Sequence, residues 1–320
     1  PESGKLEPIY DHPGTHELHA RAVAPRPEPD GRSSTVRPES PTGKLYALDV
    51  YNGDPRLTPH LVPGTVKRLR VIEGIPPAAP SPAGDDGEPR VAAPLTGRRL
   101  LGEVPVEEDG SFHIDVPADL PVKLQLLDEE GLALESCDWI WVKQREYRGC
   151  IGCHEDPELT PENRFVQAAA RPANQLTLPP ERRRTVTFQE HVGPILTERC
   201  LSCHLQEGNS LPLGSMQGEE GARRAYEALL AANNGKAGAA GIGRWVDPGR
   251  ARTSRLIWAL LGRVTARPWD DVEEATVELP TNHEGLLSEE ERRTIIEWID
   301  LGAQWRMAVE PDAAAEGGAP

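Results

Sequence analysis

The sequence is poor in aromatic residues, cysteine, methionine and positive charge. Aromatic residues make up 5% of its 320 residues, and there are five cysteines and two methionines. Lys and Arg number 35 against 51 Asp and Glu, which gives a formal net charge of −16. This balance argues against nucleic acid or an anionic membrane surface as a partner, because both attract a basic face.

Long apolar runs are also missing. No uninterrupted run approaches the about 20 residues that cross a bilayer, so we expect no membrane span. The first residue is Pro1 rather than Met, and we therefore expect a signal peptide or a longer N-terminal region before it. The cysteines fall into two close pairs plus Cys137, whereas a secreted disulfide scaffold spreads an even set along the chain.

The first half of the chain predicts an extended arm and then strands. Residues 1–41 are polar and Pro-rich without apolar periodicity, which indicates an arm or linker. Short alternating runs begin at KLYALDVY, continue in TVKRLRVIEG, and give about four further strands between residues 98 and 143. We therefore expect a small antiparallel β-sandwich at 42–148.

The second half predicts a linker and then helices. Residues 149–184 are Pro-rich and should form a loop segment and linker, whereas 185–308 have apolar residues at helical spacing. Ser288 is expected to begin the last helix as its N-cap, with Glu291 as its capping-box partner. We expect residues 309–320 to form a disordered tail. The fold class is therefore α+β, with the β-sandwich followed by an all-α domain.

A Cys-x-x-Cys-His frame occurs twice, as CIGCH at 150–154 and CLSCH at 200–204. Such a frame sets two thiols to form thioether links to the vinyl groups of a haem, and its His supplies an axial nitrogen to the iron. The sequence therefore predicts two covalently bound c-type haems. Their protein ligands and attachment points would be Cys150, Cys153, His154, Cys200, Cys203 and His204.

Paired cysteines have two other common uses, as a redox-active pair and as half of a zinc site. Neither needs a His directly after the second Cys, and a thioredoxin-type pair would follow a strand in a βαβ unit, which this sequence does not predict. Cys137 is the remaining thiol. It is either a small buried residue of the strand before DWIWV or a metal ligand, and the first is the more common role.

Residues 186–305 resemble the cytochrome c domains of large secreted bacterial multidomain proteins. The resemblance rests on FQEHVGPILTERCLSCH, on WVDPGRARTSRLIWALLG, and on LSEEERRTIIEWIDLGAQW. Such domains often carry Met-Pro before the final helix, with the Met as the sixth iron ligand. In this chain the corresponding pair is Leu279-Pro280.

The middle of the chain resembles the middle domain of hydrazine synthase alpha-type proteins. The motifs are GEVPVEEDGSFHIDVPADLPVKLQLLDEEG and WIWVKQREYRGCIGCHEDPELTPENR. The resemblance implies a β-rich domain ending in a haem site, a second haem domain after it, and a β-propeller before Pro1. In that family a Tyr a few residues after the motif holds a catalytic haem while the motif His binds zinc. Here the position four residues after His154 is Glu158.

Histidines are the candidates for the remaining axial ligands. For the second haem we expect His283, because Met216 follows His204 too closely to reach across the ring and Met307 lies after the final helix. The rival candidate for this ligand is His191. The alternative interpretation of His283 is a solvated side chain on a loop, with no role in haem binding. For the first haem we expect the second axial ligand to be His113 on the strand GSFHIDV. The next candidates are His60 and then His16 and His19 of the arm.

These observations predict a dihaem c-type cytochrome that transfers electrons as a module of a larger redox protein or complex. The alternative is a haem enzyme of the hydrazine synthase or peroxidase type, with catalysis at the first haem. Redox proteins would be the partners in either case. Covalent haem attachment takes place outside the cytoplasm, so we expect a periplasmic or extracellular location. Trp139 and Trp141 are expected on one face of a strand, either against a porphyrin or in the sandwich core.

Overall fold

The computed structural model of the chain describes residues 36–53, 61–75, 97–153, 165–205, 211, 213–231, 244–267, 270, 283 and 285–306, together with Pro13 and Pro25. The chain divides into two compact units, residues 1–35 and 36–320. All helices and strands named below belong to the second unit. Most of the expected arm and all of the expected tail lie outside the described residues.

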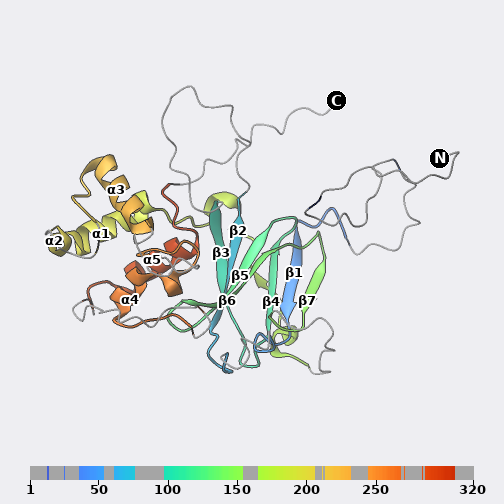
Figure 1. The fold of residues 1–320 in the computed structure, drawn as a ribbon. Helices are drawn as coiled ribbons and strands as arrows, with labels where there is room; N and C mark the ends of the chain where they lie inside the picture. The colour runs from blue at the N-terminus through green and yellow to red at the C-terminus, as the bar shows by residue number, and fades with distance from the viewer. Residues whose placement is uncertain are drawn as a thin grey trace. The chain divides into compact units, whose positions relative to one another are not determined.

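The first sheet contains four strands in the order β7-β1-β4-β8 (Figure 1). These are β1 (Thr42–Ala47), β4 (Phe112–Pro117), β7 (Tyr147–Cys150) and β8 (Asn174–Gln175). β1 and β4 are antiparallel, but β7 pairs with β1 and β8 pairs with β4 in parallel. The expectation of an antiparallel sandwich is therefore wrong for this sheet, because the chain returns to both of its edges through long connections.

The second sheet is antiparallel throughout, in the order β3-β2-β5-β6. Its strands are β2 (Arg68–Gly74), β3 (Arg98–Pro105), β5 (Val122–Leu127) and β6 (Ala133–Ile140). With β4 of the first sheet, this confirms the four strands expected between residues 98 and 143. Alternate residues of both sheets, such as Leu45, Ile114 and Val71, form one buried core between them.

Helices make up the rest of the described chain. After the 3-10 turns η2 (Gln167–Ala170) and η3 (Pro180–Arg182) come a π-helical turn, η4 (Phe188–Val192), and the helices α1 (Gly193–Arg199), α2 (Leu201–His204) and α3 (Gly218–Leu230). The 3-10 turn η5 (Ala251–Thr253), α4 (Arg255–Leu261) and α5 (Glu289–Asp300) follow. The structure thus has mixed helix and sheet content with two sheets, in agreement with an α+β fold. No helix within the described ranges has the length and apolar character needed to cross a membrane.

Local sequence signals explain where these helices begin and end. Ser288 Oγ accepts from the backbone N–H of Glu291, whose carboxylate accepts from the backbone N–H of Ser288, so the predicted capping box is confirmed. Gly262 ends α4 in the left-handed conformation, with φ 63°. The helical segment leading into CLSCH is divided, because the π-helical turn precedes α1 and Cys200 separates α1 from α2.

The helices cover the outer face of the second sheet. Ile72 of β2 is buried in the core of the helical layer, among residues such as Phe188 and Trp298. On the same sheet face, Gln304 donates to the backbone carbonyl of Arg98 at 2.9 Å. The unit from residue 36 onward therefore has three layers, two sheets and one helical layer, and the second sheet is buried on both sides.

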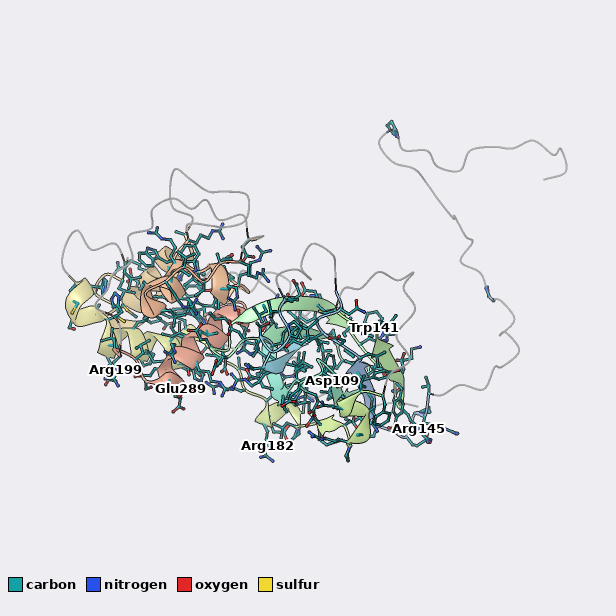
Figure 2. All side chains as sticks on the ribbon, turned by 90° about the horizontal axis from the view of Figure 1, so that it is seen from below. Asp109, Trp141, Arg145, Arg182, Arg199 and Glu289 are labelled. Carbon is teal, nitrogen blue, oxygen red and sulfur yellow. The ribbon has the colours of Figure 1, made fainter. Side chains whose placement is uncertain are left out.

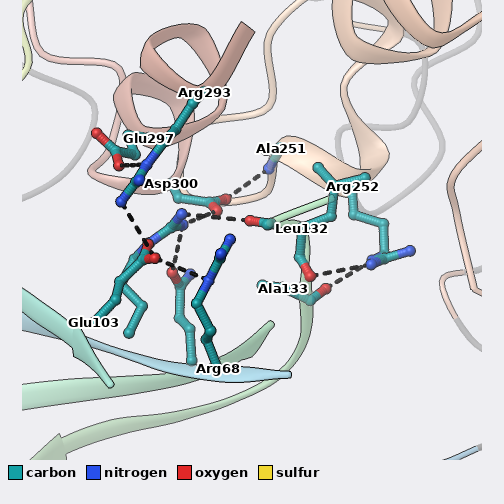
Figure 3. A network of polar contacts seen from close by, with 12 residues as sticks. Arg68, Glu103, Leu132, Ala133, Ala251, Arg252, Arg293, Glu297 and Asp300 are labelled. Atoms are coloured by element: carbon teal, nitrogen blue, oxygen red, sulfur yellow. Dashed lines mark hydrogen bonds and ion pairs between the residues drawn. The ribbon is translucent and has the colours of Figure 1, made fainter. Parts of the chain in front are cut away.

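Ion pairs fill the contact between the second sheet and the helical layer (Figure 3). Arg70 of β2 donates to Glu103 at 2.8 Å through Nε and to Asp300 at 2.8 Å through Nη1. Asp300 also accepts from the backbone N–H of Ala251 at 2.9 Å. Arg252 donates to the carbonyl oxygens of Leu132 and Ala133. The buried charged groups of Arg70, Asp300 and Arg252 are therefore hydrogen bonded, as burial requires.

Candidate functional site

The second Cys-x-x-Cys-His frame forms a single helical turn. Cys200 ends α1, and its carbonyl accepts from the backbone N–H groups of Cys203 and His204 at 3.2 and 3.1 Å. Cys200 is 5% exposed and packs in the helical core, whereas Cys203 is exposed. The turn follows Arg199, which lies at the surface of the helical layer, as does Glu289 (Figure 2). The frame is therefore held between the buried core and solvent.

His204 and His283 face each other across a narrow space. Their ring centroids are 6.0 Å apart and their planes differ by 16°. Nδ1 of each ring is buried and has no hydrogen-bond partner among the residues that the structure describes. The structure thus brings together the two histidines that the sequence had assigned to the second haem.

Burial sets the protonation of this site. It lowers the pKa of His204, and the nearby His283 adds to the effect, so both influences favour the neutral imidazole that metal binding requires. Burial also raises the pKa of the Cys200 thiol to about 11, with smaller contributions from Cys203 and Glu291. A redox-active Cys-x-x-Cys needs a lowered thiol pKa, so the Cys200 environment argues against that alternative.

The rival ligand His191 has a different role. Its Nδ1 accepts a hydrogen bond from the backbone N–H of Thr187 at 3.2 Å, at the start of the π-helical turn. Met216, the methionine nearest to the frame, is buried in the helical core. Met307 and the Leu279-Pro280 pair lie outside the described residues.

The first frame begins on a strand instead of a helix. Cys150 is the last residue of β7 and lies beside Ala47 of β1. Cys153 forms an isolated bridge with Gly53, and its backbone N–H donates to the carbonyl of Asn52 at 2.9 Å. Both cysteines pack against the edge of the sandwich core. His154 and Glu158 lie outside the described residues, as do His12, His16, His19 and His60.

Two glycines allow this close approach. A Cβ on Gly152 would overlap the carbonyl of Asn52, and a Cβ on Gly149 would overlap the ring of Tyr46. Part of this arrangement is visible in the sequence, since a glycine occupies the x position directly before Cys153. It could not show which backbone or ring lies against each glycine.

His113 lies on β4, two strands away from the first frame. In the sheet register it is opposite Tyr46, which in turn is opposite Gly149. The Tyr46 and His113 rings meet edge to face with centroids 6.3 Å apart. Burial and the charge of Lys44 lower the pKa of His113, and the backbone of Arg171 and Ala168 opposes this.

The other candidate residues of the sandwich are Trp139, Trp141 and Cys137, and each packs against different neighbours. Trp139 packs on Gly74 and beneath the guanidinium of Arg98, whose centre lies 5.5 Å from the indole. Trp141 is half exposed and lies near Arg148. The expectation that the two tryptophans share a face of one strand is wrong, because β6 ends at Ile140 and Trp139 has φ 47°. Cys137 pairs with β5 and packs against the sandwich core.

No cluster of three or more His, Cys, Asp or Glu side chains in the described part of the chain is arranged to hold a metal ion. A polar cavity of about 370 Å³ lies between β5, β6 and the η5 region, and no sequence motif predicts it. Its charged groups largely pair with one another. Lys123 contacts Asp138, and Arg267 contacts Asp270.

Comparisons with known proteins show similarity to hydrazine synthase alpha subunits. Residues 64–155 match the family described as hydrazine synthase alpha subunit middle domain. The chain is similar to hydrazine synthase subunit alpha of Kuenenia stuttgartiensis, with 25% identity over 78% of this chain and 39% of that protein. Among solved structures, hydrazine synthase of Kuenenia stuttgartiensis shares the fold, with a TM-score of 0.68 and 24% identity over 85% of this chain and 44% of that chain.

The resemblance to hydrazine synthase alpha-type proteins is therefore supported by sequence and by fold. The family match covers β2 to β7 and ends at Glu155, directly after the CIGCH frame. The chain spans 39% of the length of the curated relative, well under half.

Proposed function

We propose that the chain is a dihaem c-type cytochrome module that transfers electrons within a larger, hydrazine synthase-like redox assembly. The observation that carries this proposal is the pair His204 and His283. One belongs to a Cys-x-x-Cys-His frame and the other comes from the segment before α5, yet their rings are nearly parallel and 6.0 Å apart.

This spacing fits an iron between the two rings. Two imidazoles that bind one metal ion from opposite sides, through bonds of about 2 Å, have ring centroids about 6 Å apart. His283 would then supply the second ligand to the iron, in place of the Met that such domains often carry.

The thiols of each frame would attach the haem. Each would add across one vinyl double bond, so that a sulfur–carbon bond would form and the thiol hydrogen would move to the neighbouring vinyl carbon. When bound, a haem would supply an iron that takes up and releases one electron at a time. The protein would hold the imidazoles, and Cys200 in the helical core would fix the attached edge. Two imidazole ligands favour a lower potential than a Met and His pair.

Location and partners follow from this chemistry. Covalent attachment of haem takes place outside the cytoplasm, which supports a periplasmic or extracellular protein. The partners would be redox proteins and further parts of the assembly, including a β-propeller domain. The net charge of −16 gives no support to a nucleic-acid partner.

A second candidate is a haem enzyme of the hydrazine synthase type, with chemistry at the first haem. It is favoured by the family match over 64–155 and by the similarity to hydrazine synthase subunit alpha. This function requires an open or displaceable position on the first iron. A high-spin first haem, together with turnover of hydroxylamine, nitric oxide or peroxide, would favour the enzyme over the electron-transfer module.

Mass spectrometry under denaturing conditions tests the proposal. The protein should be produced in cells competent in cytochrome c maturation, and the wild type should retain the mass of two haems. The double variant Cys200→Ala/Cys203→Ala should retain one, as should Cys150→Ala/Cys153→Ala. Cys137→Ala is the matched control and should retain both. A wild-type mass equal to the bare polypeptide would contradict the proposal.

A further inference from the structure

The face of the first sheet that points away from the sandwich core carries an apolar pocket of about 220 Å³. Strands β4, β1 and β7 lie side by side in this sheet (Figure 1). Leu45 of β1 and Ile114 of β4 are opposite each other and buried in the sandwich core. Tyr46 and His113, the next pair in the register, therefore point to the other face, where both line the pocket.

Hydrogen bonds fix two walls of this pocket. Tyr147 of β7 accepts a hydrogen bond from Lys44 Nζ at 2.9 Å, and the same ammonium group lies 4.9 Å from the centre of the Tyr147 ring. The segment around η2 forms another wall, where the backbone N–H of Ala168 donates to Ser111 Oγ at 3.0 Å. Tyr147 is 59% exposed. The pocket is therefore preformed and opens to solvent beside Tyr147.

His113 is the polar side chain of this pocket. Both of its ring nitrogens are buried, and neither has a hydrogen-bond partner among the described residues. Burial, followed by the charge of Lys44, lowers the pKa of His113, so the imidazole is neutral at neutral pH, with one nitrogen that donates and one that accepts. A buried polar atom without a partner destabilises a protein. A ligand that pairs with one of these nitrogens therefore gains affinity from it.

The imidazole adjoins a second hollow, which is much smaller. It measures about 70 Å³ and is lined by polar side chains that include Glu107, Arg171 and Asn174. A polar hollow of this size suits water, which serves one ring nitrogen of His113. The larger, apolar pocket offers room for an organic molecule.

The walls of the larger pocket define the chemical class of its ligand. Its lining within the described residues contains no Asp, Glu, Lys or Arg, so an ionic group would have no partner there. The rings of Tyr46 and Tyr147 favour an aromatic ligand, since aromatic groups pack well edge to face or offset. An apolar cavity of roughly 150 Å³ is enough for benzene, so this pocket holds a single ring with a small substituent.

We propose that this pocket binds a small neutral molecule of the phenol class, one aromatic ring that carries one hydroxyl group, and that this hydroxyl pairs with His113. A hydroxyl both donates and accepts, so it suits either nitrogen of the neutral imidazole. In the register Cys150 is opposite Ala47, the residue after Tyr46, and so belongs to the other face of the sheet. The inference therefore goes beyond the proposed function and does not depend on either haem.

The test compares phenol with toluene, which has the same ring but no hydroxyl. Their binding to the purified holoprotein is measured by ligand-observed NMR titration. His113→Phe keeps a flat ring and removes both nitrogens. It should weaken the binding of phenol roughly 2- to 10-fold, the usual effect of one hydrogen bond, and should not weaken that of toluene.

A pair of neighbouring variants shows whether the ligand lies in this pocket. Ala169 is exposed and lines the pocket, so Ala169→Leu should fill it and prevent the binding of both molecules. Ala170 is also exposed and belongs to η2, but the lining does not include it. Ala170→Leu is therefore the matched control and should leave both affinities unchanged.

Three results would overturn the inference. The first is a wild type that shows no saturable binding of phenol. The second is an unchanged phenol affinity in Ala169→Leu, which would put the ligand elsewhere. The third is an equal weakening of phenol and toluene in His113→Phe, which would exclude the hydrogen bond. Should His113→Phe fail to fold, the variants of the exposed residues Ala169 and Ala170 still decide whether the pocket binds phenol.

Discussion

Nη1 of Arg70 lies 2.8 Å from Oδ2 of Asp300, and the two side chains are 1% and 0% exposed. One belongs to the middle of a strand and the other to the last residue of α5, so this pair joins the second sheet to the helical layer. Burial raises the pKa of Asp300, and the charge of Arg70 and the N–H of Ala251 oppose that rise. The contact therefore depends on both partners being present.

Removing one member of this pair should destabilise the protein strongly. We expect Asp300→Ala to lower the free energy of unfolding by about 3 to 5 kcal/mol, because it removes one of the two carboxylates that pair with the buried Arg70 guanidinium. The double variant Arg70→Met/Asp300→Leu should recover much of this loss, since both charges of the pair are then removed and Glu103 keeps Arg68 and Arg293 as partners. Urea unfolding followed by circular dichroism measures both.

The exposed pair Arg223 and Glu227 is the control for this prediction. It spans one turn of α3, and both side chains are at least one-third exposed. Arg223→Ala should change the free energy of unfolding by no more than about 0.5 kcal/mol. An Asp300→Ala effect as small as that of the control would show that the buried pair does not hold the layers together.

Gly152→Ala should remove the first haem and spare the second. The new methyl group would overlap the carbonyl of Asn52, so the turn that carries Cys153 must move away from the sandwich edge. The corresponding position of the second frame is Ser202, which is exposed, and Ser202→Ala is the control. Haem mass should fall to one in the glycine variant and stay at two in the serine variant. Two haems with unchanged spectra in Gly152→Ala would contradict the prediction.

His283→Ala should convert one low-spin haem to a high-spin state and leave the other unchanged. The physical reason is that its imidazole faces His204 at the spacing of two ligands on one iron. Optical and electron paramagnetic resonance spectra measure the change. His191→Ala should not produce it, because that imidazole is already engaged with Thr187. The opposite pattern, with the loss in the His191 variant, would move the ligand to His191.

Ser288→Ala should lower the free energy of unfolding by about 1 kcal/mol, through loss of the capping box of α5. The N–H of Ser288, followed by Arg199, holds the pKa of Glu291 below its usual range. A depressed folded pKa means that this stabilisation is present above the unfolded pKa of about 4.3 and is lost as the pH falls through the folded pKa. Ser288→Ala keeps the backbone N–H from which the Glu291 carboxylate accepts, so this pH-dependent part is removed by Glu291→Gln instead. Thermal unfolding at pH 7 and at pH 3 measures it, and the difference between the wild type and Glu291→Gln should shrink at the lower pH. A difference that stays constant across this range would argue against the role of the Glu291 carboxylate.

The regular strands and helices could be predicted because their apolar residues repeat with the right period. β1, for example, alternates between buried and partly exposed side chains along its length. The edge strands β7 and β8 could not be predicted, since four and two residues are too few to show a period. The burial of Arg70 and Glu73 on β2 could not be predicted from the sequence either. They are buried because partners from distant segments, Asp300 and Arg183, neutralise them.

The candidate site, like the fold, could be predicted only in part from the sequence. The two frames are visible as motifs, and the position of His283 before the last helix was enough to pair it with His204. The surroundings of His113 were not visible, because they depend on a pocket assembled from β1, β4 and the segment around η2. A single sequence does not show how three such segments meet.

The placement of Cys150 and Cys200 sets an order for biogenesis. Cys200 is 5% exposed within the helical core, so an attachment enzyme can reach its thiol only before that core closes. Cys150 ends β7, an edge strand that pairs with β1, so the other strands of the sandwich can assemble before β7 joins them. On the proposed function, the second haem would therefore be attached to a chain whose helical layer is still open, whereas the first would be added to a largely folded sandwich. Slow maturation should accordingly yield protein that lacks the second haem more often than the first.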